Sequence, residues 1–192
     1  MTASASKVHF GLEGLTIFFE DATAQDGYEA PTTIPGIVGF NRTAQTNSTK
    51  FYADNTTYYV VNDDKGDEAE LETAGIPKAI LARMLGWYVD SKGALVRVTD
   101  GKPEHFAMAY RVEGDQAARA QVCYDCCAKV PDQSNATLGE SVDVQTETIT
   151  LDIVPKVING HKTVSVTLDE SDDATAFAGF FSSVYTPVPS NG

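Results

Sequence analysis

The chain has 192 residues, 42% of them hydrophobic, and a formal net charge of −13 at neutral pH. Its length and composition predict a single globular domain that buries roughly 70% of the surface exposed by the unfolded chain. The negative charge argues against a protein that grips nucleic acid or an anionic membrane, since both partners are themselves negative. Solubility alone would explain the charge, and so would a surface past which DNA moves without binding.

The N-terminal part of the chain predicts strands after a flexible start. Residues 1–7 are mostly small and polar, and we expect an arm that orders only against a partner. No apolar core with a small-residue cleavage site follows, so we expect no secretory signal, and no run approaches the roughly 18 apolar residues of a membrane span. Residues 15–19 predict a strand, and residues 34–40 an edge strand or the start of one, because they include Pro35. Residues 41–49 fit either strand or loop.

The stretch from residue 50 to residue 87 has the clearest patterns of strand, turn and helix in the sequence. Strand-forming residues cluster in two short runs, 50–53 and 57–61, which are broken at residues 54–55. Residues 62–66 are polar, end in a glycine and predict a turn.

A strand with a one-sided row of acids is predicted after this turn. Glu68, Glu70 and Glu72 occupy every second position, so their carboxylates share one face. A short helix follows over about residues 77–85, with Pro77 in its first turn and Gly86 as its C-terminal stop. The apolar residues of this helix recur every four positions. We expect that face to pack on a sheet, because so short a helix is not stable alone in water.

The second half of the chain predicts strands joined mainly by hairpins. They are expected at residues 87–89, 94–98, 106–112, 117–130, 141–154 and 163–168. The alternation within 141–154 slips near Glu147, which either a β-bulge or a strand covered on different faces at its two ends would explain. We expect Asp173 to cap a short apolar segment with helical character, and residues 187–192 to form a C-terminal tail. The sequence therefore predicts a mainly β fold: an antiparallel sandwich or partial barrel with one flanking helix, in a single domain.

Three cysteines lie close together in a C-x-x-C-C motif, formed by Cys123, Cys126 and Cys127. A tetrahedral zinc site needs four ligands, and the sequence offers neither a second cysteine pair nor paired histidines. The simpler interpretation places Cys126 with Tyr124 on one face of a strand and Cys123 on the other, as small hydrophobic side chains.

The sequence contains none of the motifs that would indicate an enzyme. A glycine-rich phosphate loop, a G-x-S-x-G motif and an H-E-x-x-H motif are all missing. The acidic cluster near Gly66 does not fit a calcium loop, because aligning its glycine puts Val61 at the first ligand position. We expect no catalytic activity, no metal and no cofactor.

Several segments, in a fixed order along residues 8–187, resemble the major tail protein (tail tube protein) of long-tailed, non-contractile bacteriophages. They read GLEGL, TIPGIVGF, FYADNTTYYV with EAELE and IP, then the alternating hairpin that ends at Tyr124, VQTETITL and VYTP. The pair Cys126-Cys127 has no counterpart in that pattern. We expect the chain to lack the additional immunoglobulin-like domain that some relatives carry.

The resemblance implies a structural virion protein. Such subunits form hexameric rings, and the rings stack into the tail tube through which DNA passes into the host. The implied partners are further copies of the chain, the tape measure protein, the tail terminator and the distal tail or baseplate proteins, without specific DNA binding or a membrane. The implied location is the phage tail, after assembly in the host cytoplasm. Joining sheets across subunits would also remove exposed strand edges.

Two groups of residues are candidates for roles in such a tube. We expect acid-bearing strand faces to line the channel, although each row could equally be an outer solvated face. The candidates are Glu68, Glu70, Glu72, Asp143, Gln145 and Glu147. We also expect a loop to contact the neighbouring ring, because loops of this length are usually functional. Its residues are Asp54, Asn55, Asn62, Asp63, Asp64, Lys65, Gly66 and Asp67.

Two other classes of protein remain open from the sequence. A soluble β-sandwich that serves as a binding or adhesion module would stay monomeric and recognise a glycan or a receptor. An acidic DNA mimic would bind DNA-handling proteins. Its charge would need to be denser than the 21% charged residues found here, which include 14 basic ones.

Overall fold

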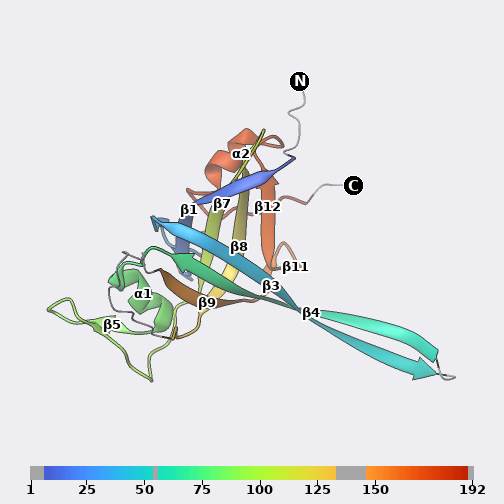
Figure 1. The fold of residues 1–192 in the computed structure, drawn as a ribbon, viewed down its shortest axis with the longest axis horizontal. Coiled ribbons are helices and arrows are strands. Elements are labelled where there is room, and N and C mark those ends of the chain that lie inside the picture. The colour runs from blue at the N-terminus through green and yellow to red at the C-terminus, as the bar shows by residue number, and fades with distance from the viewer. Residues whose placement is uncertain (1–6, 54–55, 133–145, 190–192) are drawn as a thin grey trace, which may run out of the picture.

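The computed structural model describes residues 7–53, 56–132 and 146–189, and Figure 1 shows its fold. Within these ranges the helices are α1 (Lys78–Leu85) and α2 (Ala174–Gly179). The strands are β1 (His9–Phe19), β2 (Thr32–Thr33), β3 (Ile37–Ala53), β4 (Thr56–Thr73), β5 (Tyr88–Val89), β6 (Leu95–Val96), β7 (Phe106–Gly114), β8 (Arg119–Ala128), β9 (Glu147–Ile153), β10 (Lys156–Ile158), β11 (His161–Thr163) and β12 (Ser165–Asp169).

The described strands form one large antiparallel sheet and two small ribbons. The large sheet has the order β2-β1-β7-β8-β9-β4-β3, and β12 also pairs with β8. Because β7 occupies one edge of β8, β9 and β12 share the other edge: β12 pairs from Arg119 to Cys123, and β9 pairs from Cys126 to Ala128. The sheet therefore forks at β8. This mainly β, antiparallel architecture confirms the predicted fold class.

The first of two hydrophobic cores lies inside the curled sheet. The start of β3 bends over β7, where the rings of Phe40 and Tyr110 have centroids 4.9 Å apart. Helix α1 adds Met84 and Leu85 to this core, as predicted for its apolar face. The most deeply buried members include Leu15, Ile17, Leu71, Met84, Phe106, Met108, Leu151 and Ile153.

The second core lies on the opposite face of β7 and β8. Ala107 and Ala109 alternate with the residues of the first core, so β7 is buried on both faces. Helix α2 covers this side with Phe177. The carboxylate of Asp173 accepts the backbone N–H groups of Thr175 and Ala176, each at 2.9 Å, and so caps the helix.

The predicted boundaries of α1 are confirmed. Pro77 stands directly before its first residue, and Gly86 ends it in the left-handed conformation with φ of 68°. A Cβ atom at Gly86 would lie 2.5 Å from the carbonyl carbon of Lys102, so the loop before β7 can pack closely only against a glycine. Arg83 holds the helix in place through ion pairs with Glu29 and Glu104.

Two sequence predictions are wrong. The turn at residues 62–66 does not exist, because β4 runs through this segment and stays paired with β3. The irregularity there is a β-bulge, at which Gly66 takes φ of 103°. A second bulge lies where the pairing shifts between Phe106 and Met108 of β7. It brings Cys126 into the same core as Cys123, whereas strict alternation separated them.

Candidate functional site

The first feature with a candidate function is an outward, polar sheet face. Glu68, Glu70 and Glu72 point away from the first core, while Ala69, Leu71 and Thr73 between them are buried, as the alternation predicted. The strands on both sides of β4 continue this surface with polar side chains. Across from the glutamates lie Asn41 and Thr43 on β3 and Thr148, Thr150 and Asp152 on β9. We call these eight residues the acidic face.

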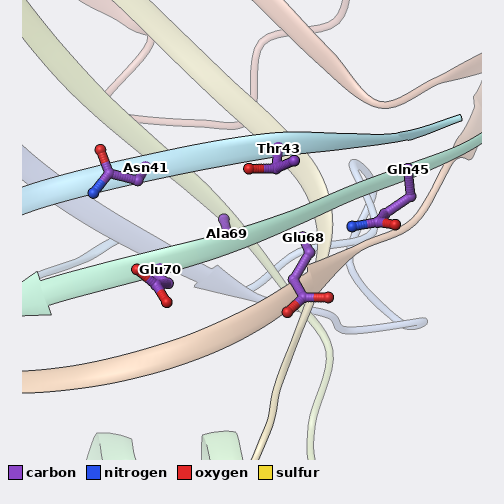
Figure 2. Close-up of a pocket in the computed structure, with 6 residues that line it drawn as sticks. All are labelled: Asn41, Thr43, Gln45, Glu68, Ala69 and Glu70. Carbon is purple, nitrogen blue, oxygen red and sulfur yellow. The ribbon is translucent and has the colours of Figure 1, made fainter.

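A shallow depression of about 300 Å³ lies on the acidic face. Figure 2 shows its lining: side chains of β3 on one side and of β4 on the other. The lining residues are Asn41, Thr43, Gln45, Glu68, Ala69 and Glu70. None of them has an aromatic ring, and their functional groups are amides, one hydroxyl and two carboxylates.

The charges of the acidic face are only partly compensated. The ammonium group of Lys129 lies 2.8 Å from a carboxylate oxygen of Asp152 and 3.5 Å from one of Glu68. The hydrogen bond to Asp152 is the main reason why the pKa of Lys129 is raised. Thr146 donates its hydroxyl to Glu72 at 2.5 Å. Within the described chain, Glu70 has no ion pair, so the face keeps a net negative charge.

Glu147, the other described residue of the predicted channel-lining group, is not part of the acidic face. It lies opposite Thr73, in phase with the core residue Ile149. Its carboxylate accepts the backbone N–H of Ile76 at 3.1 Å and so fixes the approach to α1. Asp143 and Gln145 lie outside the described residues. Sequence reasoning missed Thr148, Thr150 and Asp152, although their alternation with Ile149, Leu151 and Ile153 is visible in the sequence.

The second feature is a long two-stranded arm that projects from the body (Figure 1). Strands β3 and β4 stay paired out to Ala53 and Thr56, but β4 pairs with β9 only from Asp67 to Thr73. Residues 44–53 and 56–66 therefore form a ribbon with no third strand among the described residues. We call this ribbon the arm. It contains the predicted contact residues Asn62–Gly66, as strand rather than loop; Asp67 lies at its root, and Asp54 and Asn55 lie outside the described residues.

The outer part of the arm exposes large apolar side chains. Phe51, Tyr58 and Tyr59 have 62%, 73% and 64% of their surface exposed. A two-stranded hairpin is at best marginally stable in water, because it has no face to bury. An arm of this composition is therefore expected to gain its stability from a partner.

The root of the arm is built from close contacts. Gly66 is required, since a Cβ atom there would lie 2.2 Å from the carbonyl oxygen of Ile153. Next to it, the guanidinium group of Arg42 pairs with Asp67 at 3.1 Å and donates to the sulfur of Cys123 at 3.6 Å. A hydrogen bond from Cys126, followed by the charge of Arg42, lowers the pKa of the buried Cys123 thiol against the opposing effect of burial. Through Cys123, this network reaches the first core.

The described residues show no arrangement typical of a metalloenzyme. Across residues 7–53, 56–132 and 146–189, no group of three or more His, Cys, Asp or Glu side chains could hold a metal ion. The thiol of Cys126 is buried and free, and a hydrogen bond with Cys123, followed by burial, raises its pKa well above the ordinary value. In the same ranges, no helix has the length and apolar content needed to cross a membrane.

No protein-family model and no curated protein matches this sequence. Among solved structures, one similar chain belongs to the cryo-EM structure of the anti-feeding prophage (AFP) baseplate, 6-fold symmetrised. The two chains are 12% identical, and the match covers 86% of this chain and 97% of the other with a TM-score of 0.44. A similarity this loose carries no argument about function.

Proposed function

We propose that the protein is the repeating subunit of a phage-type tail tube, which forms rings that stack around a DNA-conducting channel. The observation that carries the proposal is the arm. A long ribbon with exposed aromatic side chains has little reason to exist in a monomer, because it buries nothing there. In a polymer it would cover a neighbouring subunit. The resemblance of the sequence to tail tube proteins points to the same function.

The edges of the sheet support a polymeric role. Within the described residues, β3 and β12 each pair on one side only, so their outer backbone groups are available for another strand. Exposed edges invite uncontrolled pairing between chains, and a closed ring of subunits removes them. Heterologous contacts form rings when the rotation between neighbours closes.

The acidic face is the surface that we propose to line the channel. Carboxylates repel phosphates, and the repulsion acts over about 8 Å at physiological ionic strength. A wall that carries Glu68, Glu70 and Glu72 from every subunit would let DNA pass without binding. The threonines and Asn41 beside them are neutral and offer no cation to a phosphate.

An adhesion module is the competing function, and the depression on the acidic face is one candidate site for it among the described residues. Sugar-binding sites commonly stack a sugar ring on an aromatic side chain, because the ring buries apolar surface at low entropic cost. The depression has no such side chain. The tail tube is therefore the better supported proposal.

Electron microscopy of the purified, concentrated protein tests the proposal. We expect stacked rings or hollow tubes, with the acidic face on the inner wall. A protein that remains monomeric in sedimentation experiments at its highest soluble concentration, and that binds a glycan on an array, would contradict it.

The channel assignment needs its own test in an assembled particle. Changing Glu70 and Glu72 together to lysine should leave tube formation intact and slow DNA ejection. The matched control is Glu113→Lys with Glu170→Lys, which alters the charge equally at two positions outside the acidic face. Normal ejection by the Glu70/Glu72 variant would remove the acidic face from the inner wall.

A further inference from the structure

Strand β12 presents an open backbone edge to the solvent. At one end of its pairing with β8, Tyr124 donates its backbone N–H to the carbonyl of Val164. At the other end, Glu170 donates its backbone N–H to the carbonyl of Ala118. The backbone groups of successive residues in an antiparallel strand point to alternate sides, so every second residue of β12 points away from β8. These outward residues are Ser165, Thr167 and Asp169.

This edge lacks the devices that usually protect an edge strand. The five residues of β12 include no proline and no lysine, and no bulge interrupts their pairing with β8. The one charged residue, Asp169, is held by Arg119. Val166 and Leu168 lie at the margin of the second core and are only partly buried. A further strand beside β12 would therefore extend that core.

The outer edge of β4 in the arm is also open. Strand β9 pairs with β4 only as far as Asp67, so residues 56–66 have no neighbour on that side among the described residues. An uninterrupted apolar run is typical of a strand that is buried on both faces, whereas a half-solvated strand alternates. The exposed residues that form such a run here are Tyr58, Tyr59, Val60 and Val61. This part of β4 has the sequence of an inner strand at the position of an outer one.

Charge does not select the partner of the arm. Asp63 and Asp64 offset Lys50 and Lys65, so the arm as a whole has no net charge. Its contact depends instead on backbone hydrogen bonds and on apolar area, and the edge of another sheet offers both.

The lengths and side chains of the described strands narrow the choice of edge. Strands β2, β5, β6, β10 and β11 have only two or three residues each. The outer edge of β3 is longer, but it has polar side chains on both faces in the arm, such as Thr46 and Asn47. An apolar strand beside them would bury little apolar surface. Beside β12, the same strand would cover Val166 and Leu168.

We infer that the outer edge of β4 in the arm of one copy pairs with β12 of a second copy and extends its sheet. The inference rests on the proposed polymeric function and adds the strand to which the arm binds. The arm projects away from its own body and its own β12 (Figure 1), so the contact joins two copies. It joins different surfaces of these copies, so it is heterologous and can repeat from subunit to subunit.

Removing one outward N–H group tests the pairing. Thr167→Pro deletes a backbone donor that β8 does not use, so the monomer should keep its fold, which thermal unfolding checks. The protein concentration at which assembly begins should rise about tenfold or more, because the arriving strand loses a hydrogen bond and meets the proline ring. The control Thr167→Ala keeps the N–H group and should shift that concentration less than about twofold. Equal assembly by a folded Thr167→Pro variant and the control would overturn the inference.

Cross-linking tests the contact without disturbing the backbone. In a Cys127→Ser background, protein with Asn62→Cys in the arm is mixed with protein carrying Thr167→Cys; both positions are exposed. A short bis-maleimide should join the two chains during assembly. A mixture of Asn62→Cys with Thr33→Cys, on the exposed edge strand β2 at the other end of the sheet, should give no product. Intact tubes without the product between residues 62 and 167 would overturn the inference.

The outcomes separate this inference from the proposed function. If the wild-type protein forms no rings or tubes at any concentration, the proposed function fails and the inference falls with it. If tubes form but Thr167→Pro and the cross-links behave like their controls, only the assignment of β12 fails. If protein with Asn62→Cys alone is cross-linked to itself in the tubes and gives no product with Thr167→Cys, the arms bind each other and the inference is wrong.

Discussion

The body and the arm share the same two strands, but different forces hold them in place. Within the body, β4 alternates buried Ala69, Leu71 and Thr73 with outward glutamates and has a neighbour on each side. Within the arm, the same strand exposes both faces and has β3 alone beside it. Backbone pairing can thus extend a strand well beyond the core, but the extension contributes little to the stability of the monomer. We expect substitutions in the body to lower the stability of the monomer. Substitutions in the outer arm should leave that stability nearly unchanged and impair assembly.

The largest effect on folding is expected from Leu71→Ala. Leu71 is 0% exposed in the first core, and its truncation leaves a cavity that costs about 3 kcal/mol of unfolding free energy. Urea denaturation measures the loss. Val61→Ala, ten residues earlier on the same strand, serves as the control in the arm. A similar loss for both variants would show that the arm packs against the body in solution.

A smaller effect is expected at the root of the arm, from Gly66→Ala. The added Cβ atom would meet the carbonyl oxygen of Ile153 at 2.2 Å, and the alanine would have to adopt φ of 103°. The close contact and the backbone strain together cost about 2 kcal/mol of unfolding free energy. Gly160→Ala is the control, because Gly160 also has a positive φ but no atom within 4 Å of its Cβ position. Thermal unfolding should show the larger loss for Gly66→Ala. Equal losses would mean that the root of the arm is not tightly packed.

The ion pair between β8 and β12 should have a modest, pH-dependent effect. The hydrogen bond from Arg119 lowers the pKa of Asp169 below its unfolded value, so the stabilisation is present above that unfolded value. It is lost as the pH falls through the lower pKa of the folded state. Arg119→Gln should therefore cost about 0.2–1 kcal/mol near neutral pH, as for other surface ion pairs, and much less near pH 2. A loss that is the same at both pH values would contradict the assigned cause.

The smallest effect on monomer stability is expected from Tyr59→Ser in the arm. Tyr59 is 64% exposed, and changing it should alter the unfolding free energy by less than about 0.5 kcal/mol. The same substitution should impair tube formation, which electron microscopy and sedimentation report. Normal tubes from Tyr59→Ser would remove the outer arm from the subunit contacts.

The sequence predicted the features that depend on local patterns. The acid row on β4 follows from strict alternation, the end of α1 from Gly86, and the cap of α2 from Asp173, and all three are confirmed. These signals reside within a few neighbouring residues, so no knowledge of the tertiary structure is needed to interpret them.

The features that depend on distant strands were not predictable in this way. Residues 62–66 have the composition of a turn, but β4 is paired with β3 on both sides of this segment, and the pairing keeps it extended. The only departure from regular pairing within this segment is a bulge at Gly66. The bulge near Cys126 likewise arises from the register between β7 and β8.

The glycine at the root of the arm also has a mechanical consequence. At about 3.3 Å per residue, the segment from Thr56 to Gly66 reaches roughly 33 Å, so a tilt of 10° at Gly66 moves the tip by roughly 6 Å. Such leverage turns a small angular change into a displacement as large as a side chain. In the proposed polymer, the close contacts at the root would therefore fix the direction of the arm and, with it, the position of the tip on a neighbouring subunit.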